Sequence, residues 1–312
     1  MPRYRTALPQ LDGHVFLTDG GLETTLVFHE GLELTCFAAF PLVCTEEGRD
    51  KLTHYFQPYL DLAEERQLGF ILDTPTWRAN PDWGAQLGFT GQALTDVSRA
   101  AVTYLEGLRR RHAHSGLPIV LNGVIGPRGD GYKIETSLTA AEAATYHGPQ
   151  IQAFRDTEAD MVSAITMTSV EEAIGIAWAA QTAGMPVVIS FTVETNGRLP
   201  SGQALGSAIE EADGTTGAYP AYYMINCAHP THFKAVLVGN APWLNRIRGL
   251  RANASAKSHA ELDVASELDI GDPQELGLHY ADLCARLRSL KILGGCCGTD
   301  RRHVAAICDA CL

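Results

Sequence analysis

Eight short apolar runs, separated by longer amphipathic stretches, constrain the fold of this chain more than any other feature of its sequence. Parallel strands that are covered by helices on both faces have near-continuous apolar sequences, and they alternate with helices along the chain. We predict strands at residues 14–18, 69–72, 118–121, 160–165, 186–191, 221–225, 245–251 and 290–293. The seventh is the weakest candidate, because its sequence RIRGLRAN is unusually basic for a buried strand.

Helical stretches fill the intervals between these strands. Residues 46–66 present one apolar face at helical spacing. Asp272 and Pro273 have the residue types of a helix N-cap and first turn, and a last helix follows Asp300. Because the eight strand–helix alternations show no linker-like break in composition, we predict an α/β fold, a closed (β/α)8 TIM barrel, in one domain that spans residues 1–312.

Polar and metal-binding residues recur directly after the predicted strands. They are Asp19-Gly20-Gly21, Asp73-Thr74, Asn122-Gly123, Asn226-Cys227, Asn253 and Gly295-Cys296-Cys297. In a TIM barrel the residues that follow the strands meet at the carboxyl-terminal face, where active sites lie. We therefore predict a functional site that combines these segments.

The composition argues against several classes of function. The 312 residues carry a formal net charge of −12, which disfavours nucleic acid or an anionic membrane as a partner. The N-terminal segment lacks the apolar core of a signal peptide, and no apolar run approaches the roughly 18 residues of a transmembrane helix. We expect a cytoplasmic protein whose eight cysteines are reduced thiols. Whether the chain forms an oligomer stays open.

Three cysteines form the strongest candidate for a metal site. Cys296 and Cys297 lie in the sequence GGCCGT after the eighth strand, and Cys227 follows the sixth. Adjacent cysteines can share a metal only in a turn, and we expect the three glycines at 294, 295 and 298 to provide its conformational freedom. Zinc binds cysteine sulfur tetrahedrally, and three protein ligands leave one position open for chemistry.

A zinc ion with three thiolates activates water poorly, but it lowers the pKa of a substrate thiol and leaves the sulfur nucleophilic. The pattern therefore predicts alkyl transfer to sulfur, from a sulfonium or quaternary ammonium donor. The alternative is that cysteines are merely small buried apolar residues. That interpretation suits Cys284, Cys308 and Cys311, which lie on core-facing helical stripes, while Cys36 and Cys44 can be either.

The DGG of residues 19–21, the NC of residues 226–227 and the GGCCGT of residues 294–299 together resemble the homocysteine S-methyltransferase family. The resemblance covers essentially the whole chain. The family consists of zinc-dependent (β/α)8 barrels and includes betaine-, S-methylmethionine- and cobalamin-dependent enzymes. The resemblance implies methyl transfer between two small molecules, a donor and the thiol of homocysteine, as in methionine biosynthesis. Its implied zinc ligands are Cys227, Cys296 and Cys297, and its implied substrate-binding residues are Asp19, Gly20, Gly21, Thr74, Asn226 and Asn253.

One position departs from the family pattern. The family usually has a glutamate after the fourth strand that holds the homocysteine ammonium, and the aligned residue here is Ile165. An ammonium buried without a carboxylate is strongly unfavourable. Either another acid, Asp73 or Glu23, compensates, or the acceptor is a thiol or selenol without that amino group. A third alternative is a non-catalytic zinc-binding homologue.

The remaining candidates are weaker. Trp77 and Arg78 follow the second strand, where an indole ring can face a cationic methyl donor or the guanidinium can bind a carboxylate. Residues that we expect on exposed helix ends, outside the site, are Arg109, Arg110, Arg111, His112, His114, Glu171 and Glu172.

Overall fold

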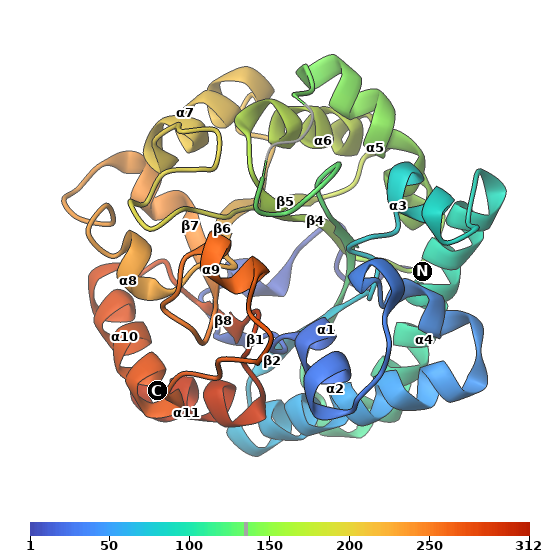
Figure 1. Cartoon of the computed structure of the whole chain (residues 1–312), viewed down its shortest axis with the longest axis horizontal. Coiled ribbons are helices and arrows are strands. Elements are labelled where there is room, and N and C mark those ends of the chain that lie inside the picture. Colours follow the sequence, from blue (N-terminus) through green and yellow to red (C-terminus); the bar gives the residue numbers. More distant parts are fainter. Residues whose placement is uncertain (134–136) are drawn as a thin grey trace.

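The computed structural model describes residues 1–133 and 137–312, and it contains a closed barrel of eight parallel strands (Figure 1). Each strand pairs with its neighbours in sequence, and β1 closes the barrel against β8. The strands are β1 (Phe16–Leu17), β2 (Gly69–Asp73), β3 (Ile119–Ile125), β4 (Met161–Met167), β5 (Val187–Phe191), β6 (Tyr222–Asn226), β7 (Ile247–Ala252) and β8 (Ile292–Gly295). The predicted (β/α)8 TIM barrel is confirmed.

Helices surround the barrel in the order in which they follow the strands (Figure 1). The longer ones are α2 (Glu46–Arg66), α4 (Gln92–Arg111), α5 (Ala140–Arg155), α6 (Val170–Ala183), α7 (Leu205–Thr216), α10 (Pro273–Arg286) and α11 (Arg301–Cys311). The shorter ones are α1 (Leu22–Thr24), α3 (Pro81–Gln86), α8 (Pro230–Phe233) and α9 (His259–Asp263). Figure 1 shows α1 and α9 in front of the barrel opening. No helix in the described part of the chain is long and apolar enough to cross a membrane.

The start of α10 illustrates why these segments become helical where they do. Asp272 accepts hydrogen bonds from the backbone amides of Gln274 and Glu275 at 2.7 and 3.1 Å, and Pro273 is the first residue of the helix. A side-chain acceptor satisfies amides that have no partner in the first turn, and proline has no amide to satisfy there. The N-cap predicted at this position is confirmed.

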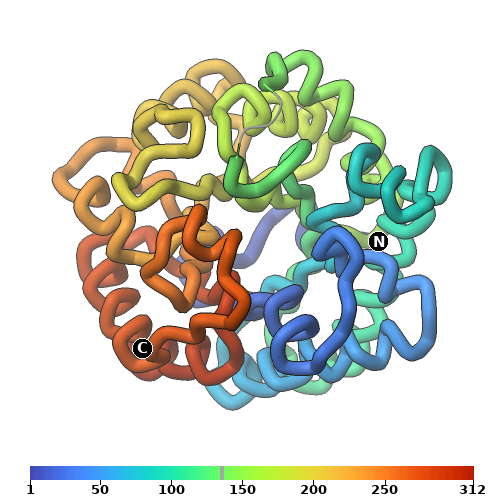
Figure 2. Tube along the Cα trace, in the orientation of Figure 1, coloured from blue at the N-terminus to red at the C-terminus, as the bar shows by residue number. Residues whose placement is uncertain are grey.

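The amino-terminal segment fills the end of the barrel at which the strands begin. Gln10 is buried, and its amide lies 3.3 Å from the hydroxyl of Tyr222. Leu8 joins a compact inner core of strand residues, namely Phe16, Ile71, Val120, Met161, Val188, Tyr222, Met224 and Ile292. In Figure 2 the dark blue amino-terminal segment is visible through the barrel on its far side. The described cavity that contains the three cysteines lies at the other end, where the strands finish.

The basic sequence of β7 is explained by paired arginines. Arg246, just before the strand, forms an ion pair with Asp213 at 2.7 Å. Arg251 is buried inside the barrel between Asp19 and Asp73. The strand pairs with both β6 and β8. The positive charge that weakened this strand as a candidate is thus neutralised by acids from elsewhere in the sequence.

Three of the residues expected on exposed helix ends are buried instead, so those expectations are wrong. Arg109 forms an ion pair with Asp160 at 2.9 Å, and His112 lies 2.6 Å from Glu64. Glu172 accepts a hydrogen bond from a buried histidine of α5. In each case a neighbouring element covers the helix end, which helical periodicity does not reveal. The others of the group, Arg110, Arg111, His114 and Glu171, are exposed as predicted.

Candidate metal and thiol site

The predicted metal ligands meet at the carboxyl ends of the strands. Cys227 follows β6, and Cys296 and Cys297 follow β8. Their Sγ atoms all lie within 4.8 Å of one another, with 3.5 Å between those of Cys227 and Cys297. Zinc–sulfur bonds of about 2.3 Å at tetrahedral angles place the sulfur atoms about 3.8 Å apart. The spacing and the softness of the three sulfur donors therefore fit a zinc ion.

The glycines around the two adjacent cysteines have distinct roles. Gly294 and Gly295 belong to β8, and a Cβ atom at either position would collide with Thr18 or Thr299. Gly298 instead has a φ of +76°, which glycine adopts without steric cost. The expectation that all three glycines free the turn is therefore corrected: two allow close packing of neighbouring segments, and Gly298 makes the turn.

Cys227 has an unusual backbone conformation for a residue with a side chain. Its φ is +56°, in a region that costs an L-residue about 1–2 kcal/mol. The conformation is held from both sides, because its amide donates to the carbonyl of Arg251 at 3.1 Å and its carbonyl accepts from Nε2 of His259 at 2.7 Å. Such strain persists where the surroundings enforce it, often at functional sites.

Tyr132 belongs to the site, although the sequence analysis did not identify it. Its hydroxyl lies 3.3 Å from Sγ of Cys227 and 3.6 Å from Sγ of Cys297. Its ring stacks on His259 with 4.2 Å between the ring centroids. Burial, with the neighbouring thiols adding to it, raises the pKa of Tyr132 well above its usual value. The phenol therefore stays protonated and can donate its hydrogen toward sulfur.

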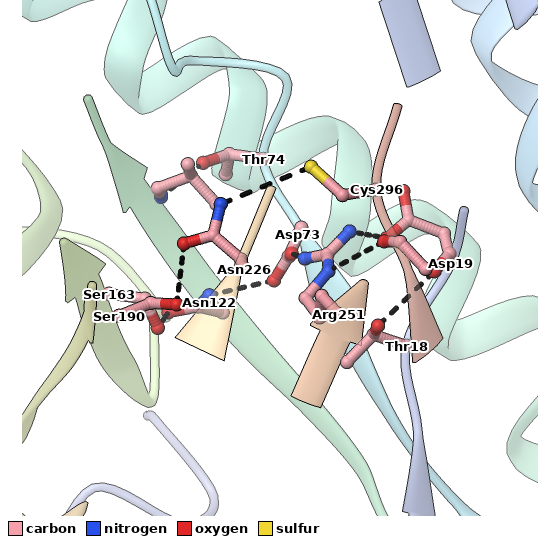
Figure 3. Close-up of polar contacts among 12 residues, drawn as sticks. Thr18, Asp19, Asp73, Thr74, Asn122, Ser163, Ser190, Asn226, Arg251 and Cys296 are labelled. Carbon is pink, nitrogen blue, oxygen red and sulfur yellow. Dashed lines mark hydrogen bonds and ion pairs between the residues drawn. The ribbon is translucent and has the colours of Figure 1, made fainter. Parts of the chain in front are cut away.

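A buried cation lies at the inner end of the site. The guanidinium of Arg251 forms ion pairs with Asp19 and Asp73 (Figure 3). Asp19 also accepts a hydrogen bond from the hydroxyl of Tyr55 at 3.0 Å, and Asp73 accepts one from the amide of Asn122 at 2.7 Å. Both carboxylates are thus held by partners within the protein. The unusually basic seventh strand was the sequence signal for this cluster.

This arrangement sets the local electrostatics. Burial raises the pKa of Asp19 to about 7, although the Arg251 charge opposes the shift. Hydrogen bonds from the thiols of Cys227 and Cys297 lower the pKa of Cys296 well below its usual value, and the charge of Arg251 adds to that effect. The pKa values of Cys227 and Cys297 are raised instead, so Cys296 is the thiol of the cluster that ionises most readily.

The residues implied to bind substrate fall into two groups. Asp19, Gly20, Gly21 and Thr74 line a cavity of about 440 Å³ that also contains the three cysteines. Asn253 is buried and does not line this cavity. The first group can contact a small molecule in the cavity directly.

Asn226 is buried as well, and it connects strands around the thiol cluster. Its Oδ1 accepts hydrogen bonds from the amide of Thr166 at 2.9 Å and from the hydroxyl of Ser190 at 2.6 Å. Its amide nitrogen donates to the Thr166 hydroxyl at 2.8 Å and lies 3.9 Å from Sγ of Cys296 (Figure 3). Most of its hydrogen-bonding capacity is therefore used to position β4, β5 and the cysteine turn.

The aromatic residues after β2 already surround a cation. The guanidinium of Arg78 lies 4.4 Å from the ring centroid of Trp77 and 4.0 Å from that of Trp83. Trp77 lines the cavity, and its indole nitrogen donates to the carbonyl of Ile165 at 3.2 Å. Arg78 itself therefore makes a cation–π interaction at these rings, and the Trp77 ring forms an apolar part of the cavity wall.

Comparison with known proteins agrees with this geometry. Residues 16–311 match the family described as homocysteine S-methyltransferase. No curated protein sequence matches the chain. The oxidized form of the homocysteine methyltransferase MmuM from Escherichia coli has a similar structure, with a TM-score of 0.71 and 17% identity over 98% of this chain and 99% of that chain. Its metallated form has a TM-score of 0.68 and 18% identity over 94% and 95%.

Proposed function

Because the chain belongs to the homocysteine S-methyltransferase family and is a methyltransferase, we propose that it transfers a methyl group to the thiol of homocysteine in a zinc-dependent reaction. The product of this reaction is methionine. In this proposal Cys227, Cys296 and Cys297 bind Zn²⁺, and the donor is a sulfonium or quaternary ammonium compound. The observation that carries the proposal is the cluster of three thiols in the wall of a cavity large enough for two small molecules.

The chemistry follows from the three sulfur ligands of the metal site. Zinc, when bound, supplies a Lewis acid that holds a substrate thiol in its ionised form near neutral pH. On binding, the thiol would release its proton to solvent water, and its sulfur would then form a bond to the methyl carbon. The bond from that carbon to the positively charged donor atom breaks, and its electron pair stays with the donor, which becomes neutral. No other acid or base is needed for this step.

The chain's own residues prepare the site for these two substrates. Tyr132 can donate its hydroxyl hydrogen toward Cys227 and so limit the charge on that sulfur. Among the described residues, the cavity wall contains two arginines and seven acids, namely Asp19, Glu23, Asp73, Asp130, Asp263, Glu267 and Asp269. A wall with more acids than bases attracts cations, which favours a positively charged methyl donor over an anionic one.

The proposal is tested by metal analysis and activity together. Protein purified under reducing conditions is expected to contain about one zinc per chain, because three thiolates suffice for a tight site. It is then assayed with homocysteine and each of S-methylmethionine, S-adenosylmethionine and betaine. Cys296→Ala is expected to lose both zinc and turnover, whereas the control Cys284→Ala, on α10, keeps both. Protein without zinc that still methylates homocysteine would refute the mechanism.

A second acceptor class is favoured by one observation. Ile165 lines the cavity at the position where the family usually has a glutamate for the homocysteine ammonium. A thiol or selenol without an amino group would not need that carboxylate. Adding such acceptors to the same assay separates the two cases, because turnover with homocysteine above that with the amine-free thiols excludes the second. Zinc binding without turnover on any acceptor would indicate a non-catalytic homologue.

A further inference from the structure

If homocysteine is the acceptor, its ammonium needs a carboxylate partner, and β4 does not provide one. Ile165 is 8% exposed and presents an apolar side chain to the cavity. An ammonium that leaves water for such a wall loses its hydration without compensation. A carboxylate from another element has to provide the ion pair.

Two of the buried acids near the thiols already have partners within the protein. Asp19 is paired with Arg251 and accepts the hydroxyl of Tyr55. Asp73 is paired with the same guanidinium and accepts the amide of Asn122. Each oxygen of these two carboxylates already accepts a hydrogen bond, and the Arg251 charge already stabilises their ionised forms. An ammonium would therefore gain less from them than from a carboxylate without a cation. The structure therefore argues against Asp73 as the compensating acid.

Glu23 is differently placed. It lies in α1, which is attached to the cysteine turn by two hydrogen bonds: the amide of Gly21 donates to the carbonyl of Thr299 at 3.0 Å, and the amide of Gly298 donates to the hydroxyl of Thr24 at 3.1 Å. These bonds keep Glu23 on the same side of the cavity as Cys296, and Glu23 lines that cavity.

In the described part of the chain, the carboxylate of Glu23 also has no cation paired with it. Within residues 1–133 and 137–312 no side chain donates a hydrogen bond to it or forms an ion pair with it. Burial raises the pKa of Glu23 to about 7, and the negative charges of Cys296 and Asp19 contribute. An acid in this state gains most from a cation that arrives with the substrate.

We propose that Glu23, on α1, binds the α-ammonium of homocysteine and so replaces the glutamate that β4 lacks. This inference rests on the proposed function. The other acids of the wall are less suited. Asp263 and Asp269 form ion pairs with lysines, and Glu267 is exposed. The carboxylate of Asp130 accepts the backbone amide of Tyr132 at 2.6 Å. Glu23 is thus a residue that determines acceptor specificity, and the methyl transfer step itself does not require it.

The test compares homocysteine with 4-mercaptobutanoate, which differs only in lacking the amino group. In the zinc-loaded protein, Glu23→Gln is expected to raise KM for homocysteine about 10- to 100-fold, the value of one charge-assisted hydrogen bond. The kinetics with 4-mercaptobutanoate should stay within a factor of two or so. Glu267→Gln removes an equal charge from the mouth of the same cavity and should leave the ratio of the two thiols unchanged.

Calorimetric binding of the two thiols to zinc-loaded protein answers the same question without turnover. The unsubstituted protein is expected to prefer homocysteine, Glu23→Gln should abolish the preference, and Ile165→Glu in the Glu23→Gln background should restore it. Equal effects of Glu23→Gln on both thiols, or no effect on either, would overturn the assignment of Glu23. Absence of turnover with preserved, Glu23-dependent preference would instead refute the proposed function alone.

Discussion

Replacing Arg251 by methionine should reveal how strongly the core of the site depends on one buried cation. The guanidinium is buried between Asp19 and Asp73, which are themselves buried. Methionine fills a similar volume but has no charge, so two carboxylates lose their counter-ion. Removal of one partner from a buried ion pair typically costs about 3–5 kcal/mol, and we expect a loss in this range at pH 8.

The pH dependence of this loss identifies its cause. The pKa of Asp19, about 7, lies above its usual value of about 3.9, so its ionisation already destabilises the folded state as pH rises toward 7. Arg251 opposes that shift, so its removal raises the pKa of Asp19 further. Above pH 7 the variant should therefore lose about 1.4 kcal/mol of folding stability for each pH unit, a loss that the unsubstituted protein does not show. The stability gap should therefore widen from pH 7 to pH 8.5.

Urea denaturation followed by circular dichroism at pH 6, 7, 8 and 8.5 measures the gap. Arg248→Met is the matched control, because it removes the same side chain from the same strand at a half-exposed position. It should change stability by about 0.5 kcal/mol or less. Adding Asp19→Asn to Arg251→Met should recover part of the loss. Equal losses for the two arginine variants, or a gap that does not change with pH, would refute this account of the buried cluster.

Two further predictions concern the cysteine turn and the acceptor. Gly298→Ala should lose about 1–2 kcal/mol or more of stability, because the residue has a positive φ. Its Cβ would also lie 2.8 Å from the carbonyl oxygen of Asp269, so zinc affinity measured by chelator competition should fall as well. The control Gly184→Ala, with a φ of +65° and open space around it, should lose stability but not zinc affinity. The ratio of kcat/KM for homocysteine to that for 4-mercaptobutanoate should rise as pH increases through about 7, because the ammonium needs Glu23 ionised. Burial raises the pKa of Glu23 to about 7, Cys296 and Asp19 add to the shift, and Arg251 opposes it. A ratio that is flat across pH 5.5–8 would contradict the second prediction, as would a slope that persists in Glu23→Gln.

The sequence by itself determined the barrel and the place of its thiols. Eight apolar runs predicted eight strands, because a strand that is buried on both faces has an almost entirely apolar sequence. The carboxyl ends of parallel strands meet by topology, so residues as distant in sequence as Cys227 and Cys296 could be brought together before any contact was known. The resemblance to the family likewise predicted, from the sequence alone, that Ile165 takes the position of a glutamate.

Only the tertiary structure decided how charges are distributed around that cluster. The basic sequence around Arg251 made the seventh strand the weakest candidate, until Asp19, which follows β1, and Asp73, at the end of β2, were seen to pair with the guanidinium. Tyr132 lies outside the helices and strands, so no periodic pattern could place it beside the cysteines. The sequence named Glu23 only as one of two candidate acids, and the structure placed it on α1 in the wall of the thiol cavity. Local propensity and periodicity act over a few residues, whereas a buried charge is compensated through space, by whichever residue the fold brings near.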